Sequence, residues 1–283
     1  MDSIAIVSCN NWKDKLFEDQ LLKRKIIENG YSAEIISWEE EKNFKKYDKY
    51  ILRSIWGYQN KYLDFKKWLN TLKENNKKVF NNVDIVLNNI KKDKQFEILF
   101  NNKIPTVETI FIDDYTKINN YKGCVVKPSI SGSGENTFLI NDENSCEISK
   151  IFKGLLQENG DLKIMVQPFI KGINNGEYSV IFINGILSHT MIRYPGIFSI
   201  KKRPELVKNP PLSVIKLAKK VSKIKDFDNY LYMRADIVLE NNNPIIMEIE
   251  LTDPDLMTKY IDSSRIQDKI MELLIDGFEN KWY

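Results

Sequence analysis

Short apolar runs alternate with amphipathic stretches over the first 88 residues of the chain. Residues at helical spacing between these runs predict helices near 16–29 and 63–73. Strands that alternate with helices pack as a parallel sheet, so we predict a small α/β domain whose ligands lie beyond the carboxyl ends of its strands. The apolar runs predicted to be strands are residues 3–9, 33–36, 50–55 and 79–80.

From residue 89 onward the pattern predicts an α+β region with mainly antiparallel strands. Asn184-Gly185 is typical of a tight hairpin turn and joins strands predicted at 177–183 and 186–193. The other predicted strands are 105–112, 124–128 and 163–169, and the predicted helices are 93–101, 212–224 and 263–275. We therefore predict an N-terminal domain at 1–88 and a second domain at 89–283. The second domain divides into a central or lid subdomain, 89–166, and a C-terminal subdomain, 167–283.

Composition excludes several classes of protein. The 283 residues carry 42 basic and 39 acidic side chains, and a net charge of +3 does not favour binding to nucleic acid. No apolar run approaches the ~20 residues of a membrane helix, and the N-terminus lacks a signal-peptide pattern. Three cysteines at irregular spacing suit reduced thiols, so we expect a cytoplasmic protein. A single histidine, His189, cannot build a multi-histidine zinc site.

Four polar side chains interrupt two strongly apolar segments near the C-terminus. Strand periodicity places Arg234 and Asp236 on one face of 233–239, and Glu248 and Glu250 on one face of 245–251. A hairpin centred on the intervening turn formers sets Asp236 opposite Glu248 and Arg234 opposite Glu250. One arginine cannot neutralise three carboxylates, whereas a hard divalent cation can. We therefore predict that Asp236, Glu248 and Glu250 bind Mg²⁺; the alternative is an edge strand with charges on its solvent face.

A second candidate segment combines a lysine with a flexible loop. Lys127 ends a predicted strand directly before the residues Ser131, Gly132, Ser133 and Gly134. Glycines let backbone N–H groups approach an anion closely, and the lysine adds a charge for phosphate oxygens. The order differs from a P-loop, where the lysine follows the glycines. An ordinary surface turn explains the segment equally well.

Three further features have both a functional and a structural interpretation. The segment Gln167-Pro168-Phe169-Ile170 ends a buried strand, where it could offer backbone groups to a purine or simply pack in the core. Glu177 begins the next strand and could accept a ribose hydroxyl or face solvent. His189 and Arg193 share a strand face and could hold an anionic intermediate, although His189 could also be a hydrogen-bonded core histidine.

In this order the segments resemble the ATP-grasp superfamily. The matching features run from about residue 89 to 255 and end in the paired Arg-x-Asp and Glu-x-Glu strands. The N-terminal part resembles the small ATP-grasp ligases related to the cyclo-ligase of D-cycloserine biosynthesis. Those carry Arg-Ser-x-Trp-Asp-Tyr where this chain reads Arg53-Ser54-Ile55-Trp56-Gly57-Tyr58, so an acceptor-pocket carboxylate is replaced by glycine. The resemblance implies a pre-ATP-grasp domain followed by an ATP-grasp fold, with the nucleotide between two antiparallel sheets.

The resemblance also implies an ATP- and Mg²⁺-dependent ligase that activates a small carboxylate as an acyl phosphate and joins it to an amine-type nucleophile. ADP and phosphate are the implied products, small molecules the implied partners, and a homodimer the implied assembly. By the family pattern, Lys94 and Lys127 hold the phosphates under the 131–134 lid, Gln167 to Ile170 bind adenine, and Glu177 binds the ribose. Arg193 and Arg234 stabilise developing charge, while the substrate residues are Arg53, Trp56, Tyr58 and His189. The alternatives are an ATP-grasp kinase and a non-catalytic nucleotide-binding module.

Overall fold

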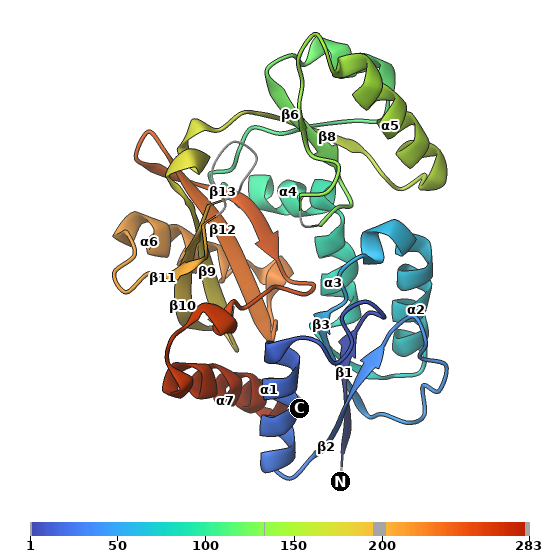
Figure 1. The fold of residues 1–283 in the computed structure, drawn as a ribbon, viewed down its shortest axis with the longest axis vertical. Coiled ribbons are helices and arrows are strands. Elements are labelled where there is room, and N and C mark those ends of the chain that lie inside the picture. Colours follow the sequence, from blue (N-terminus) through green and yellow to red (C-terminus); the bar gives the residue numbers. More distant parts are fainter. Residues whose placement is uncertain (1, 133, 195–201, 281–283) are drawn as a thin grey trace.

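Three β-sheets follow one another along the chain, with α3 (Val83–Ile90) and α4 (Lys92–Asn101) running between them (Figure 1). The computed structural model describes residues 2–132, 134–194 and 202–280. A parallel sheet comes first and two antiparallel sheets follow, which confirms the predicted fold class.

The first sheet is parallel, with strand order β2-β1-β3-β4. Its strands are β1 (Ser3–Ser8), β2 (Ser32–Ser37), β3 (Lys49–Ser54) and β4 (Lys78–Phe80), and its helices are α1 (Phe17–Glu28) and α2 (Tyr62–Glu74). Alternate residues of β1 serve different cores, because successive side chains of a strand point to opposite faces. Ile4 and Ile6 pack in the core that contains α1, whereas Ala5 and Val7 pack in the core that contains α2.

The next sheet is small and antiparallel, with strand order β5-β8-β6-β7. Its strands are β5 (Ile110–Ile112), β6 (Cys124–Pro128), β7 (Phe138–Leu139) and β8 (Ile164–Pro168). Helix α5 (Ser145–Glu158) packs against it through Ile148 and Phe152. Strand β8 continues to Pro168, so the predicted subdomain limit at residue 166 falls inside a strand.

The last sheet has five strands in the order β11-β10-β9-β12-β13. They are β9 (Glu177–Ile183), β10 (Ile186–Arg193), β11 (Glu205–Leu206), β12 (Tyr232–Glu240) and β13 (Asn243–Glu250). Helix α6 (Leu212–Val221) covers one face, where Val180 and Phe182 are buried. Helix α7 (Ser264–Asn280) covers the other face only in part, over Ile181 and Ile183. The rest of that second face carries polar residues and forms the candidate site.

The cysteines and the helices bear on two expectations drawn from composition. Cys9, Cys124 and Cys146 are all free thiols. Within the described ranges, no helix has the length and apolar character that crossing a lipid bilayer requires.

Candidate active site

A β-bulge in the hairpin of β12 and β13 brings the site carboxylates together. Asn241 and Asn242 both have positive φ, as a two-residue hairpin turn requires. From this turn the register pairs Ile237 with Ile246, but beyond the bulge it pairs Asp236 with Glu248 and Arg234 with Glu250. Met247 is the extra residue, and without it the two glutamates would share the buried face of Ile237. The predicted cross-strand pairs are therefore confirmed, and the bulge is the reason that they form.

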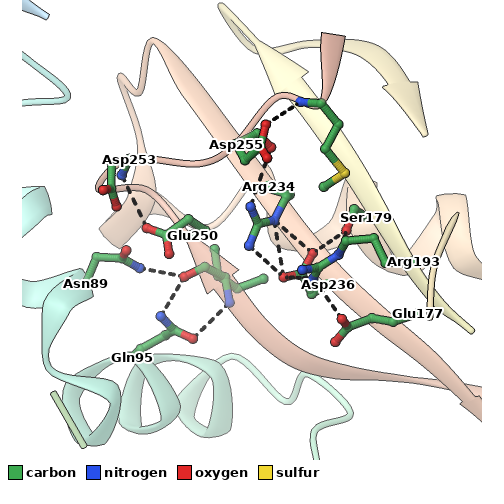
Figure 2. Close-up of polar contacts among 12 residues, drawn as sticks. Asn89, Gln95, Glu177, Ser179, Arg193, Arg234, Asp236, Glu250, Asp253 and Asp255 are labelled. Carbon is green, nitrogen blue, oxygen red and sulfur yellow. Dashed lines mark hydrogen bonds and ion pairs between the residues drawn. The ribbon is translucent and has the colours of Figure 1, made fainter. Parts of the chain in front are cut away.

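Asp236 lies at the centre of a buried network with two arginines (Figure 2). Arg234 Nε lies 3.0 Å from Asp236 Oδ1, and Arg193 Nη2 lies 2.6 Å from Oδ2. Ser179 Oγ donates to Asp236 Oδ1 at 2.7 Å, and Arg193 Nη2 also pairs with Glu177 Oε2 at 2.7 Å. Burial alone would raise the pKa of Asp236, but Arg193 and Arg234 outweigh it and lower that pKa. Asp236 is therefore an anion that holds both arginines in place.

Glu248 is paired with a lysine that the sequence analysis did not single out. Lys92 Nζ, almost fully buried, lies 2.8 Å from Glu248 Oε1 and donates to the backbone oxygen of Ser131 at 2.8 Å. Burial opposes ionisation of Glu248, but Lys92 and Lys127 outweigh burial and lower the pKa of that carboxyl. Lys127 on β6 lies near the same group, and its own pKa is lowered chiefly by burial. Two lysines from different elements therefore converge on Glu248.

The prediction for Lys94 needs correction. Its side chain is exposed and forms an ion pair with Glu97 at 2.9 Å on the outer face of α4. Residues two apart on a helix point in nearly opposite directions, so only one of Lys92 and Lys94 can face the carboxylates. The structure gives that position to Lys92.

Two amides hold β13 along its outer edge. Gln95 Nε2 donates to the backbone oxygen of Ile249 at 2.6 Å, and Gln95 Oε1 accepts from Ile249 N at 2.9 Å. Asn89 Nδ2 donates to the same Ile249 oxygen at 2.8 Å (Figure 2). Asn89 Oδ1 accepts from Leu251 N at 2.8 Å. Because edge strands have unpaired backbone groups, these bonds fix the segment that carries Glu250.

The site ends in two acidic residues that form no ion pair among the described residues. Glu250 Oε1 accepts from Thr252 N at 2.9 Å and from Asp253 N at 3.4 Å, while burial and then Glu248 raise the pKa of Glu250. Asp253 is 5% exposed, and burial followed by Glu250 raises its pKa well above the usual range. Tyr58, from the N-terminal domain, lies in the field of the same acids, which add to the effect of burial in raising its pKa.

The carboxylates predicted to bind magnesium have more counter-charges than the single arginine expected from the sequence. Three carboxylates do share the face, but Arg193, Arg234 and Lys92 all pair with them, so a single arginine is not their only counter-charge. Among the described residues no group of three acidic, histidine or cysteine side chains is arranged to hold a metal ion. Magnesium binding by Asp236, Glu248 and Glu250 stays a prediction. The donor chemistry fits it, because carboxylate oxygens suit a hard cation and the repulsion between Glu248 and Glu250 would be relieved by one.

The glycine-rich loop and the adenine connector lie at opposite ends of the antiparallel pair β6 and β8. Ser131 and Gly132 are half-buried, Gly134 has a φ of +73°, and Ser133 lies outside the described residues. Gln167 is buried on β8, and its Nε2 donates to Thr109 Oγ1 at 2.9 Å. The residues that follow are an exposed Pro168 and the half-buried Phe169 and Ile170.

Two of the predicted substrate residues, Arg53 and His189, are buried and bonded to other parts of the protein. Arg53 is 4% exposed and joins Glu18, at 2.9 Å, to the backbone oxygen of Pro254, at 3.2 Å. His189 is buried with Nε2 hydrogen-bonded to the backbone oxygen of Leu256 at 2.8 Å, and burial lowers its pKa to about 4. Arg53 thus connects the N-terminal domain to the loop after β13, and His189 is a neutral core histidine.

The other two predicted substrate residues lie on the segment after β3. Trp56 is half-buried with its ring edge-on to Trp12, 5.5 Å between centroids. Gly57 has a φ of +95°, a left-handed conformation in which glycine is unstrained, and it turns the chain so that Tyr58 points inward and is buried. The glycine that distinguishes this chain from the resembling ligases is therefore part of a turn that positions Tyr58.

Two family models match the chain. Residues 4–81 match the N-terminal domain of D-cycloserine synthetase DcsG, and residues 81–226 match the ATP-grasp domain of prokaryotic glutathione synthetase. The two matches meet where the first sheet ends. No curated protein sequence matches the chain.

Solved structures share the fold over almost the whole length. D-cycloserine synthetase DcsG aligns with a TM-score of 0.81 at 15% identity, covering 96% of this chain and 99% of its own. D-alanine–D-alanine ligase from Bacillus anthracis aligns with a TM-score of 0.71 at 17% identity, covering 99% of both chains. The ATP-grasp ligase PsnB, complexed with a minimal precursor, has a TM-score of 0.66 at 13% identity and covers 98% of this chain and 99% of its own.

Proposed function

This chain belongs to the ATP-grasp family of ligases, and from that premise we propose that it activates a small carboxylate as an acyl phosphate and joins it to an amine-type nucleophile. ATP and Mg²⁺ are the proposed cofactors, and ADP and phosphate the proposed products. The observation that carries the proposal is the convergence of two lysines and two arginines on the half-buried Glu248 and the buried Asp236, beside a glycine-rich loop. The cations are Lys92, Lys127, Arg193 and Arg234. A small-molecule ligase of this kind, with free thiols, suits the cytoplasm, where ATP is available.

We assign the phosphates of ATP to Lys92 and Lys127. Both ammonium groups lie near Glu248. Phosphate oxygens are negatively charged hydrogen-bond acceptors like the carboxylate oxygens of Glu248, so the same ammonium groups can bind them. The 131–134 loop begins where Lys92 binds the backbone of Ser131, so it is suited to cover the phosphates. Glu135, at the end of this loop, accepts from Gln59 Nε2 of the N-terminal domain at 3.1 Å, which supports a role in excluding water. The Gln167–Ile170 connector and Glu177 are assigned to adenine and ribose.

We assign magnesium to Glu248 and Glu250, together with Asp236. When bound, the metal neutralises phosphate charge during phosphoryl transfer. The protein's own contribution is orientation, because Asp236 fixes Arg234 and Arg193 side by side on the sheet. Held in this way, the two guanidinium groups can stabilise negative charge that develops on the carboxylate and the transferred phosphoryl group.

The proposal is tested by an ADP-release screen over amino acids and small carboxylates, with mass spectrometry of the products. ADP formation should require Mg²⁺ and a suitable acid, and hydroxylamine should trap the activated acid as a hydroxamate. Release of AMP would exclude this mechanism. A stable phosphorylated product in the absence of any nucleophile would favour a kinase.

A further inference from the structure

Asp253 is a buried carboxylate with an unused hydrogen-bonding atom. It follows β13 in the loop that leads to the short helix at Thr258–Tyr260, and the residue is only 5% exposed. Asp253 Oδ2 has no hydrogen-bond partner among the described residues. A buried carboxylate in this condition destabilises a protein, because it has lost water and gained no donor.

The nearest positive charges do not satisfy Asp253, because each is bonded elsewhere. Arg53 donates to Glu18 and Pro254, and Arg234 to Asp236 and the backbone oxygen of Asp255. Lys92 binds Glu248 and the backbone of Ser131. These cations lower the electrostatic cost of the acid without supplying a hydrogen bond. Asp253 Oδ2 can therefore accept a hydrogen bond from a bound molecule.

The position of Asp253 indicates which molecule. Arg53, near the carboxyl end of β3, donates to the backbone oxygen of Pro254, the residue after Asp253, at 3.2 Å. Ligands of a parallel sheet bind at this edge, and Tyr58 follows the same strand end. On the other side Asp253 N is bonded to Glu250, at the end of the strand that carries the candidate phosphate and metal groups. A ligand at Asp253 would thus lie between the activating site and the N-terminal domain.

We propose that Asp253, with Tyr58, binds the amino group of the amine substrate in its ammonium form, and that this group releases one proton to solvent before the nitrogen lone pair attacks the acyl phosphate. This inference rests on the proposed function and defines its substrate class as amines that are protonated at neutral pH. An ammonium group has three N–H donors, and it would give Asp253 the hydrogen bond and the close counter-charge that the protein does not provide. Glu250 next to it adds further negative charge.

The test compares two probes that differ by one ammonium group, alaninamide and propionamide. Thermal unfolding is measured on the full chain with Mg²⁺ and a non-hydrolysable ATP analogue, and again without nucleotide. At tenfold excess over its Kd, alaninamide should raise the Tm of the unaltered protein by on the order of 3 °C, and propionamide should not. Asp253→Asn should abolish this shift, and Tyr58→Phe should reduce it.

The matched control is Asp255→Asn in the same loop. Asp255 Oδ1 accepts from Met257 N at 2.8 Å and is half-buried, so its carboxylate already has a donor. This variant should keep the full alaninamide shift.

Three results would overturn the inference. The first is an alaninamide shift that survives in Asp253→Asn, and the second is an equal response of the unaltered protein to propionamide. The third is an Asp253→Asn variant that loses Mg²⁺ affinity and keeps the alaninamide shift. The last would make Asp253 a metal-binding residue. None of these measurements depends on turnover, so failure of the ligase assay and failure of this inference can be told apart.

Discussion

Two buried clusters of arginine and carboxylate contact the loop that follows β13. One contains Arg53 with Glu18 and Asp19, and the other contains Arg193 and Arg234 with Asp236. Both are nearly inaccessible to solvent at their carboxylates. They differ in what surrounds the charges, and that difference separates a structural cluster from a functional one.

The Arg53 cluster is closed. Both oxygens of Glu18 accept hydrogen bonds, from Thr258 N at 2.6 Å and from Arg53 Nη2 at 2.9 Å among others. Asp19 is hydrogen-bonded to Ser54. Every one of these bonds joins the N-terminal domain to itself or to the loop at 254–258, so the cluster holds two parts of the molecule together.

The Asp236 cluster is open at one end. Asp236 itself is fully paired, but Glu250 and Asp253 next to it form no ion pair within the described residues. Uncompensated acids in a buried place are a cost to folding that a bound cation can remove. A buried arginine therefore does not by itself distinguish a structural cluster from a functional one. Acidic side chains next to it that lack a counter-charge do indicate a ligand.

Removing charge from the centre of the open cluster should have the largest effect on activity. Asp236→Asn should lower kcat by at least ~10³-fold, because it loses a candidate metal oxygen and no longer fixes Arg193 and Arg234. ADP release measured below the Tm of the variant tests this, with Glu248→Gln as a second variant of the same cluster. Activity within tenfold of the unaltered protein in both would place the chemistry elsewhere.

Breaking the closed cluster should instead affect stability. Arg53→Met leaves two buried acids unpaired and should cost about 3–5 kcal/mol, which lowers the Tm by roughly 10 °C. The KM for ATP of the remaining folded protein should stay within about twofold. Denaturant unfolding and ADP-release kinetics on the same sample distinguish the two effects. A normal Tm together with a raised substrate KM would return Arg53 to the substrate pocket.

Lys92 and Lys94, two residues apart on α4, serve as test and control for the open cluster. Lys92→Met should raise the KM for ATP by about 10–100-fold, the range expected for loss of a hydrogen bond to a charged group. Lys94→Met removes an exposed ion pair and should change the KM by less than about twofold. Equal effects of the two substitutions, or an effect of Lys94→Met alone, would refute the placement of Lys92 at the phosphates.

The fold was predictable from sequence because its signals are local. Alternating apolar runs predicted the parallel sheet, and Asn184-Gly185 predicted the β9–β10 hairpin, which forms with both residues at positive φ. Helices α3 and α5 were missed, although Asn82 caps α3 by accepting from Ile85 N, a pattern that a capping analysis would have detected.

The site was predictable only where strand periodicity governs it. The pairs Asp236–Glu248 and Arg234–Glu250 follow from the strand pattern, although the bulge at Met247 that permits them does not. To predict that Lys92 and not Lys94 faces the carboxylates, one must know which face of α4 is turned toward them. The sequence of this ten-residue helix is only weakly amphipathic and does not show that face. Asn89 and Gln95 carry no sequence signal, because their role depends on contact with a strand some 150 residues later.

His189 extends the closed cluster and gives the smallest expected effect. Leu256 connects the two, since its backbone oxygen accepts from His189 and its N–H donates to Glu18 at 3.4 Å. The pKa of His189 falls from 6.5 to about 4 on burial, so the unfolded chain binds a proton that the folded protein excludes. Stability should therefore be intact above pH 6.5 and be lost as the pH falls toward 4, by roughly 1.5 kcal/mol at pH 5.5. His189→Gln should lack this part of the pH dependence in urea unfolding and keep its substrate KM at pH 7.5. If the free energy of unfolding depends on pH in the same way in both proteins, the ring of His189 is in contact with solvent. If His189→Gln raises the substrate KM, the ring contacts substrate.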